Sequence, residues 1–259
     1  MNVDYYNNYG DQDIDSYLDD VLLKDEAEKE RTELLRSLCP EDTVNALDVG
    51  AGHGLLLKEL AKNIPCEGIE ITEEKVALIQ RRFKIKATLG SADNLPFEDN
   101  SFDTLYCCEV LEHLPYGVYK KALQELERIA RKYIIISVPY CESVIMTRCP
   151  YCRAIFNPNY HFRRFERDSF KGLFSTFKLA EYHAFGTLRN YGLIPRIIRE
   201  YVKPKEFSMT NVCPACGYHR EKSTSLTSTE ERPKSKIAKL LPKKPRWHIV
   251  KFEKSHAER

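Results

Sequence analysis

Short apolar runs alternate with helical patterns through the middle of the chain. Residues 44–49, 66–71, 87–90, 102–110 and 132–140 read VNALDV, CEGIEI, ATLG, FDTLYCCEV and KYIIISVPY, with the lengths and residue types of buried strands. The segments between them, including HGLLLKELAKN, TEEKVALIQRRF and YKKALQELERIAR, repeat apolar residues at helical spacing. Such alternation is typical of βαβ units, so the pattern predicts an α/β fold with a parallel sheet and helices on both faces.

The flanking segments extend this pattern. Residues 1–40 place apolar side chains at helical spacing and end at Cys39-Pro40, which predicts an N-terminal helical segment. After the fifth strand, RDSFKGLFSTF (167–177) predicts a helix, whereas KLAEYHAF (178–185) and RWHIVKFEK (246–254) predict extended chain. We expect these two extended segments to pair as the terminal strands of the sheet.

Length and composition set the class of protein. A chain of 259 residues with 42% hydrophobic content can bury one sizeable core, so one principal domain is expected. No apolar run approaches the roughly 20 residues of a membrane-spanning helix, and the N-terminus, MNVDYYNNYGDQDIDSY, lacks the regions of a signal peptide. These features predict a cytoplasmic protein without a membrane span. Its nine cysteines are then expected to be reduced thiols or metal ligands.

Charge is segregated along the chain, although the formal net charge is only +2. Residues 1–30 hold ten acidic side chains against two lysines, whereas residues 232–251 hold eight basic side chains and no acidic one. The first interpretation is a solvated acidic helix and a solvated basic loop. A basic arm that binds a polyanion is the alternative.

A glycine-rich turn marks the first candidate site. Asp48, Gly50, Gly52 and Gly54 lie where the first predicted strand turns into a helix. Glycine permits the unusual backbone angles of such a turn, and the helix N-terminus offers N–H groups to a ligand. Glu70 ends the next strand, where a carboxylate can accept hydrogen bonds from ribose hydroxyls. The spacing is G-x-G-x-G, which differs from the G-x-G-x-x-G of a dinucleotide site.

A third motif indicates which cofactor binds at this turn. The segment GSADNLPFEDNSFDTLYCCEVLEHL, residues 90–114, carries Asp93 after the third strand and an acidic turn before the fourth. Together with ALDVGAGHG and GIEIT, it resembles the class I S-adenosylmethionine-dependent methyltransferases, in the family that includes ubiquinone-type methyltransferases. The resemblance covers about residues 44–140. It implies S-adenosylmethionine as cofactor and a Rossmann-like sheet in the order 3-2-1-4-5-7-6, with strand 7 antiparallel.

The resemblance also implies residue roles. The cofactor would meet Asp48, Gly50 and Gly52 at its methionine end, Glu70 at its ribose, Ala92 and Asp93 at its adenine, and Glu109 in the loop beside the methionine, with Ala51 and Ile71 in the same site. His113, after the fourth strand, is the first candidate for a general base, and a packing role in the loop is the alternative. His161, in NPNYHFRRF, is the second candidate, and a structural role beside a metal site is its alternative.

Two C-P-x-C knuckles predict a structural zinc site. The four ligands are Cys149, Cys152, Cys213 and Cys216. In each knuckle a tight turn aims two thiolates at one point, and two knuckles complete a tetrahedral shell of four cysteines. The separation of 60 residues between Cys152 and Cys213 exceeds the usual spacing, which an insertion before the last strand explains. Replacement of one cysteine by His161 or His219 is the alternative ligand set.

These motifs divide the chain. We expect an N-terminal helical segment (1–40), a methyltransferase core with strands one to six (41–190), and a small zinc-ribbon-like insertion formed by residues 141–165 and 191–222. A basic linker (223–245) then leads to the terminal strand of the core (246–254).

The function predicted from the sequence is methyl transfer from S-adenosylmethionine to a small-molecule acceptor. The alternative is an RNA-directed methyltransferase, or a non-catalytic nucleic-acid-binding protein, that uses the zinc module and the basic arm. Arg163, Arg164 and Arg167, interleaved with Phe162 and Phe165, support the alternative because stacking and phosphate contacts occur together in single-strand binding.

Overall fold

The computed structural model describes residues 14–20, 22–142, 146–189, 207, 211–218 and 243–255 of the 259-residue chain. Its helices include α2 (Ile14–Asp20), α3 (Glu26–Ser37), α4 (Leu55–Leu60), α5 (Glu73–Phe83) and α6 (Tyr116–Ile129), with the short 3-10 helices η2 (Leu22–Lys24), η3 (Leu111–His113) and η4 (Arg167–Phe170). The strands of the main sheet are β1 (Ala46–Val49), β2 (Cys66–Glu70), β3 (Ala87–Leu89), β4 (Phe102–Cys108), β5 (Ala130–Pro139), β8 (Phe177–Phe185) and β11 (Trp247–Lys254). Two small antiparallel pairs add β6 (Thr147–Arg148) with β7 (Ile155–Phe156), and β9 (Leu188–Arg189) with β10 (Lys243–Lys244).

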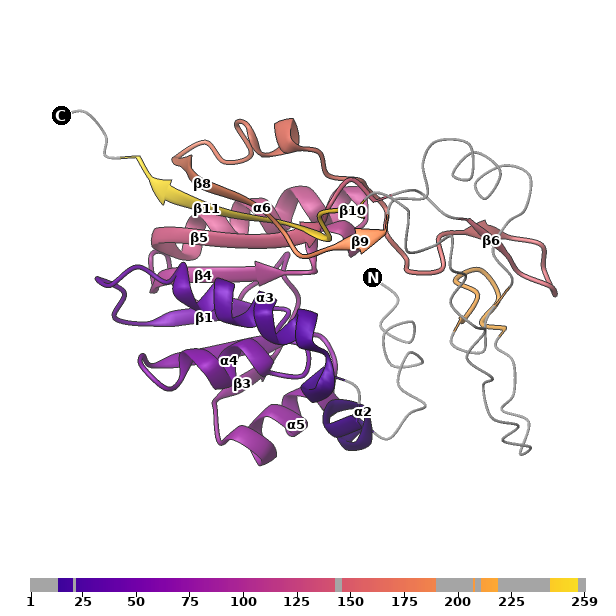
Figure 1. Cartoon of the computed structure of the whole chain (residues 1–259), viewed down its shortest axis with the longest axis horizontal. Coiled ribbons are helices and arrows are strands. Elements are labelled where there is room, and N and C mark those ends of the chain that lie inside the picture. The colour runs from indigo at the N-terminus through magenta and orange to yellow at the C-terminus, as the bar shows by residue number, and fades with distance from the viewer. Residues whose placement is uncertain are drawn as a thin grey trace.

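The seven-stranded sheet has the order β3-β2-β1-β4-β5-β11-β8. Strands β1 to β5 pair in parallel, and β11 pairs antiparallel with both β5 and β8. This confirms the predicted order, with β8 and β11 as the sixth and seventh strands, and the helices cover the sheet as expected (Figure 1). In open sheets of this kind ligands bind beyond the carboxyl ends of the strands where the strand order reverses, here between β1 and β4.

Side chains of the central strands alternate between two apolar layers. Leu105 and Cys107 of β4 point into the larger layer, which α6 covers with Leu126. Tyr106, between them, points to the opposite face, where Leu35 of α3 packs. This follows from the two-residue period of a strand. Because both faces are covered, the strands read as continuous apolar runs in the sequence.

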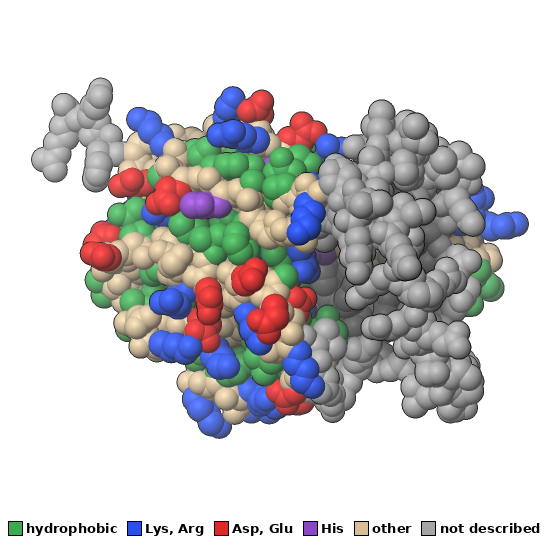
Figure 2. Space-filling view, in the orientation of Figure 1, with side chains coloured by type: hydrophobic (Ala, Val, Ile, Leu, Met, Phe, Trp, Pro, Cys, Tyr) green, Lys and Arg blue, Asp and Glu red, His purple; other side chains and the backbone are tan. Residues whose placement is uncertain are grey.

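Helix α3 is the element that carries the N-terminal segment onto the sheet. Its N-cap, Asp25, accepts hydrogen bonds from the N–H groups of Ala27 and Glu28 at 2.9 and 3.3 Å. Such a cap satisfies N–H groups that have no partner within the helix. Leu35 and Leu38 bury the apolar side of α3, so its polar side faces outward and toward the carboxyl ends of the strands. On the face that α3 covers, acidic and basic side chains are interspersed (Figure 2).

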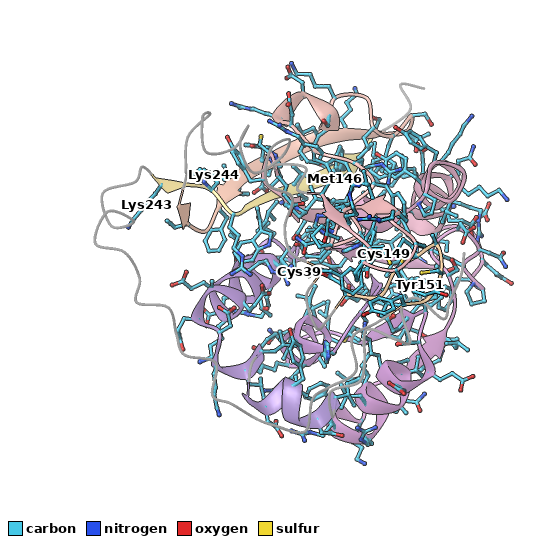
Figure 3. The ribbon with its side chains drawn as sticks, turned by 90° about the vertical axis from the view of Figure 1, so that its right-hand side faces the viewer. Cys39, Met146, Cys149, Tyr151, Lys243 and Lys244 are labelled. Atoms are coloured by element: carbon cyan, nitrogen blue, oxygen red, sulfur yellow. The ribbon has the colours of Figure 1, made fainter. Side chains whose placement is uncertain are left out.

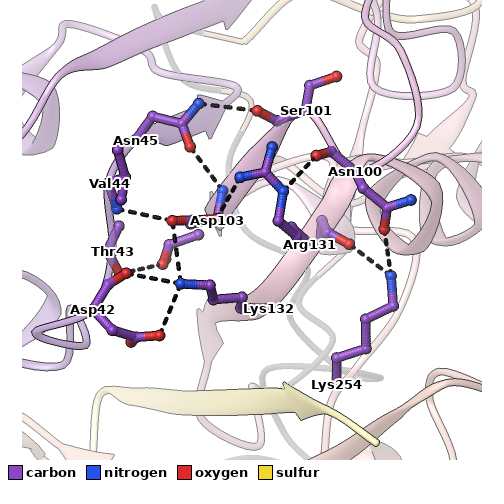
Figure 4. A network of polar contacts seen from close by, with 12 residues as sticks. Asp42, Thr43, Val44, Asn45, Asn100, Ser101, Asp103, Arg131, Lys132 and Lys254 are labelled. Carbon is purple, nitrogen blue, oxygen red and sulfur yellow. Dashed lines mark hydrogen bonds and ion pairs between the residues drawn. The ribbon is translucent and has the colours of Figure 1, made fainter. Parts of the chain in front are cut away.

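A buried carboxylate closes the amino-terminal edge of the parallel strands (Figure 4). Asp103 of β4 is 1% exposed and accepts a hydrogen bond from the Val44 N–H at 2.9 Å. Arg131 and Lys132 pair with the same carboxylate at 2.9 and 3.4 Å, and Asn45 accepts the Asp103 N–H at 2.9 Å. The pairs compensate a charge that would be costly if buried alone. This end of the sheet therefore serves stability and leaves the opposite end for ligands.

One predicted helix is wrong. Within residues 167–176 the only helix is η4, because Gly172 adopts a left-handed conformation (φ +65°) and Phe170 and Phe174 turn into the core instead, and Phe177 begins β8. The predicted helix around residues 195–202, the Ser/Thr-rich linker and residues 223–242 of the basic linker lie outside the described residues. None of the helices in the described ranges combines the length and the apolar character needed to cross a bilayer.

Candidate functional site

A cavity of about 400 Å³ opens at the carboxyl ends of β1, β2 and β4. Its walls come from the loops that follow these strands, from the loop after β3, from α3 and from residues 159 and 160. A volume of this order is typical of sites for small ligands. The cavity therefore lies where the strand order predicts a ligand.

The loop after β1, residues 50–54, contains three glycines in left-handed conformations, and larger residues would not fit at two of them. Gly50, Gly52 and Gly54 have φ of +76°, +55° and +78°. A Cβ atom on Gly50 would lie 2.3 Å from Cγ2 of Val110, and one on Gly54 would lie 2.8 Å from Cγ1 of Ile79. The turn thus needs glycine both for its backbone angles and for its close contacts.

Glu70 holds this loop. Its side chain is 5% exposed, Oε2 accepts the Gly52 N–H at 2.8 Å, and Oε1 accepts the Ile71 N–H at 2.8 Å. A carboxylate has about four acceptor positions, so both oxygens keep capacity for donors of a ligand in the cavity. The residue is therefore placed to join the loop to hydrogen-bond donors of a ligand.

Asp48 and Arg31 give the cavity wall one charge of each sign. Asp48 is 3% exposed, and its Oδ1 has no hydrogen-bond partner among the described residues. Burial raises the pKa of Asp48 to about 7, with Arg31 opposing the rise and Glu70 adding to it. Arg31, from α3, donates to Glu28 at 2.7 and 3.0 Å. Because buried polar atoms are usually paired, the orphaned oxygen indicates a site that fits a ligand with a cationic group.

Glu109 lies in the same wall in a strained conformation. It has φ of +56°, which is uncommon outside glycine, and its N–H donates to the Ser137 C=O at 2.8 Å. Its carboxylate accepts hydrogen bonds from the Ser137 hydroxyl at 2.9 Å and from Trp247 Nε1 at 3.3 Å. Burial raises the pKa of Glu109, and Arg31 opposes the rise. Strands β5 and β11 thus support the loop after β4.

The structure brings most of the predicted cofactor residues together. The cavity is lined by Asp48, Gly50, Ala51, Gly52, Glu70, Ile71, Ala92 and Glu109. Asp93 does not line it, but its carboxylate accepts a hydrogen bond from Ser91, which does. His113 lines the cavity, and His161 lies behind it with its ring 4.5 Å from that of His113.

A cluster of three potential ligands includes His113 of the cavity wall and two residues packed behind it. Ligand atoms of Glu112, His113 and His161 lie within 4.8 Å of one another. Glu112 is 1% exposed, and neither of its carboxylate oxygens has a hydrogen-bond partner in the described part of the chain. Glu142 bonds to Nδ1 of His161 and so orients that ring. Two imidazoles and one carboxylate can bind a divalent cation or the polar atoms of an acceptor.

The electrostatics of this cluster favour neutral groups. Burial raises the pKa of Glu112 well above its usual value, and the Glu109 carboxylate adds to the rise. Burial, together with the nearby His161, lowers the pKa of His113 to about 3. An imidazole with such a pKa is neutral near neutral pH, so it is a poor general base but keeps a lone pair for a hydrogen bond or a metal ion.

The four predicted zinc ligands converge. Their sulfur atoms all lie within 4.8 Å of one another, with 3.8 Å between Cys149 and Cys216 and 3.5 Å between Cys152 and Cys213. A tetrahedral zinc site with Zn–S bonds of about 2.3 Å has S–S edges of about 3.8 Å. A disulfide would need about 2.05 Å. The geometry fits four separate thiolates around one ion, and His219 lies outside the described residues.

Each knuckle is built by its own turn. The Cys149 N–H donates to the Ala154 C=O at 2.9 Å within the β6–β7 hairpin. The Gly217 N–H donates to the Cys213 C=O at 2.8 Å, and Gly217 has φ of +73°. The module lies beyond the carboxyl ends of the parallel strands (Figure 1), and Cys149 lies on the other side of the end-on view from Lys243 and Lys244 (Figure 3).

Comparisons with known proteins agree with this geometry. Residues 46–132 match the family described as Methyltransferase domain. An uncharacterized protein of Methanocaldococcus jannaschii is 30% identical over 180 residues, which span 66% of this chain and 76% of that protein. Norajmaline N-methyltransferase of Rauvolfia serpentina is 30% identical over 112 residues, which span 40% of this chain and 35% of the plant enzyme.

A solved structure extends the likeness to the fold. It is the 1,6-didemethyltoxoflavin-N1-methyltransferase of Burkholderia thailandensis with bound 1,6-didemethyltoxoflavin and S-adenosylhomocysteine. The TM-score is 0.53 at 15% identity, and the match covers 94% of this chain and 85% of that chain. This chain belongs to the class I S-adenosylmethionine-dependent methyltransferases. The match to this chain spans about three quarters of the length of the archaeal relative but only about a third of the length of the plant enzyme.

The sequence did not reveal that Glu28 and Arg31 of α3 line the cavity of this methyltransferase, or that Glu112 is buried beside it. Glu28 and Arg31 form an i, i+3 pair, which looks like any exposed helix pair in the sequence. Glu112 follows Glu109 by three residues in EVLEHL, but its burial depends on how the loop after β4 packs. Only the tertiary structure brings Glu28 and Arg31 into the cavity wall and places Glu112 beside His113 of that wall.

We expect Asp48→Asn to stabilise the ligand-free methyltransferase at pH 8. Because the folded pKa of Asp48, about 7, lies above the ordinary value of 3.8, the folded state retains a proton that the unfolded state loses. Wild-type stability should therefore fall between about pH 4 and pH 7, by up to about 4 kcal/mol. Asparagine lacks this titration, so urea unfolding should show a gain that grows over that range and is absent near pH 3.

A second aspartate supplies the control. The pKa of Asp42 is lowered by its hydrogen bond to Lys132, so Asp42→Asn should change stability in the opposite direction. If the free energy of unfolding of the wild type and of Asp48→Asn varied with pH in parallel, the raised pKa of Asp48 would be contradicted.

Proposed function

We propose that this methyltransferase transfers a methyl group from S-adenosylmethionine to a small-molecule acceptor. The single observation that carries the proposal is the cavity in which the glycine loop, Glu70 and the orphaned oxygen of Asp48 meet. Its size suits a cofactor and a small acceptor. Two proteins to which the chain is similar carry names that state N-methylation of small molecules, which supports this acceptor class.

The cofactor end of the cavity supplies complementary groups. Glu70 would accept hydrogen bonds from the ribose hydroxyls, and Ala92 would pack beside the adenine with Asp93 next to it. Arg31 would bind the carboxylate of the methionine moiety, and Asp48 would face its ammonium group. Asp48 is buried in the wall and Arg31 is only 15% exposed, so charge pairing there is stronger than in water.

The cofactor supplies an activated methyl group on its sulfonium. The residues of this chain would hold it and the acceptor in line and keep water out. Alignment alone can supply effective molarities on the order of 10⁵ M or more in favourable cases. No strong base is needed if the acceptor arrives unprotonated, which fits the low basicity of His113.

His113 marks the acceptor end of the cavity, with Glu112 and His161 packed behind it. His113 would contact the reacting heteroatom directly, or a divalent cation would bind to all three groups, whose ligand atoms lie within 4.8 Å of one another. If a cation binds there, calorimetry with Mn²⁺ should find a site that Glu112→Gln weakens at least about tenfold. Glu59→Gln, which changes a glutamate paired with Lys62 outside the cavity, is the control. Equal Mn²⁺ binding in both variants would exclude a cation held by Glu112 and leave only direct contact with the acceptor.

The four-cysteine cluster would hold a structural zinc ion. All four positions of a tetrahedron are filled by Cys149, Cys152, Cys213 and Cys216, which leaves no open coordination position for chemistry. The ion would then stabilise the module over the acceptor end of the cavity.

The arginines after β5 weaken the nucleic-acid alternative. Arg163 stacks over Tyr119 at 3.8 Å, and Arg167 stacks over Tyr182 at 4.9 Å. Phe165 is buried, so it offers no platform for a base. Arg163, Arg167 and Phe165 thus serve the fold, whereas Phe162 is exposed, and residues 223–242 of the basic linker lie outside the described residues.

The decisive experiment has two steps. Calorimetry should detect binding of S-adenosylmethionine and S-adenosylhomocysteine, and labelled cofactor incubated with fractionated cell extract should then label a small metabolite. Label in RNA would favour the alternative. Absence of cofactor binding, or binding of NAD instead, would refute the proposal.

A further inference from the structure

Residues 157–161 belong to the zinc module and to the cavity at the same time. The ring of Tyr160 is 6% exposed and packs in an apolar cluster with Cys149, Cys213 and Phe156. Yet Tyr160 and its neighbour Asn159 also line the cavity. One short turn thus joins the four-cysteine cluster to the wall of the site.

The second knuckle holds this turn from a distant part of the chain. The Tyr160 hydroxyl donates to the Val212 C=O at 2.5 Å and accepts the Val212 N–H at 2.9 Å, and Val212 directly precedes Cys213. Asn211 donates to the Pro158 C=O at 3.1 Å. Because these contacts are buried, the turn follows the position of the second knuckle.

The other side of the turn reaches the acceptor end. The Phe162 N–H donates to the Glu112 C=O at 2.8 Å. His161 is bonded to Glu142, and its ring contacts that of His113 at an angle of 77°. The turn is itself strained, since Tyr160 has φ of +60°, so it needs contacts on both sides to hold its shape.

We propose that Tyr160 is a positioning residue that couples the four-cysteine cluster to the acceptor end of the cavity. The metal fixes Cys213 against Cys149, the backbone before Cys213 fixes the Tyr160 hydroxyl, and the turn then sets the positions of Asn159 and His161. The term acceptor end rests on the proposed function, whereas the coupling itself does not. Loss of the metal would therefore loosen this wall and leave the glycine loop and Glu70 in place.

Hydrogen exchange with mass spectrometry tests the coupling in the full-length protein. In Tyr160→Phe, amides of residues 157–165 should exchange at least about tenfold faster, because the substitution removes both buried hydrogen bonds of the Tyr160 hydroxyl. Metal content should be unchanged, and affinity for S-adenosylhomocysteine should stay within about twofold. Tyr151→Phe is the control, because Tyr151 is in the module but 76% exposed and stacked on Tyr218.

Removing the metal from the wild type with a chelator gives a second, independent measurement. It should accelerate exchange in residues 157–165 but not in β1, β2 or β4. Wild-type exchange at 157–165 in both Tyr160→Phe and the metal-free protein would overturn the proposal.

Label transfer separates positioning from a purely structural role. Metal-loaded Tyr160→Phe should transfer label to extract at least about tenfold more slowly than the wild type at saturating cofactor. A purely structural Tyr160 would lower Tm and leave that rate unchanged. If the wild type itself transfers no label, the proposed function fails, while the exchange results still decide the coupling.

Discussion

Glu70→Ala is expected to weaken binding of S-adenosylhomocysteine between about tenfold and more than a hundredfold. A hydrogen bond to a charged group contributes roughly 1.5–3 kcal/mol, which corresponds to that range. The structure adds a second reason, because the same carboxylate accepts the N–H groups of Gly52 and Ile71. The substitution would remove a ligand contact and loosen the loop that forms the rest of the cofactor wall.

Glu67→Ala is the matched control for this prediction. Glu67 lies on the same strand, β2, but pairs with Lys86 at 2.6 Å and does not line the cavity. Its replacement should leave the dissociation constant within about twofold, since Glu67 is outside the cavity and makes no contact with the glycine loop through its ion pair with Lys86. Calorimetry at a temperature well below Tm separates loss of contact from unfolding. Equal affinity in Glu70→Ala and wild type would remove Glu70 from the cofactor site.

The sheet could be predicted from the sequence because its signals are local. Apolar runs between helical patterns located all seven strands, and the resemblance supplied their order, which the structure confirms. The glycine loop was also readable, since Gly50 and Gly54 must adopt positive φ where side chains would collide. Such a turn has no apolar periodicity, but its glycines mark it in the sequence.

Other features depend on long-range packing and leave no such signature. The burial of Glu112 and of most of Arg31 is decided by loops and helices that meet only in three dimensions. The failed helix at 167–177 shows the converse, because its apolar spacing is satisfied by Phe170 and Phe174 packing from an irregular segment. Helical periodicity is thus a weak guide where glycine interrupts the pattern.

The four-cysteine cluster was predicted only in part from the sequence. Their repeated C-P-x-C pattern predicted one cluster across a wide gap, and the structure places the four sulfur atoms within 4.8 Å of one another. The bound metal itself stays a prediction, because thiols at this spacing show only that the ligands are available. Metal analysis is therefore the measurement with the most to add.

Protein purified without added zinc is expected to contain about one equivalent of zinc per chain, and Cys213→Ser is expected to lose it. Even changes in residues that only orient a metal ligand cost about 10- to 100-fold in affinity, so removal of a ligand should cost more than about a hundredfold. Tm should fall as well, because metal binding contributes directly to folding in small zinc modules. Cys39→Ser, at a partly buried cysteine packed in the apolar cluster under α3 and not in the cluster that holds Cys149 and Cys213, should keep the metal. Metal-free wild-type protein of full stability would refute the site, whereas zinc that retains an exchangeable water would refute only its structural role.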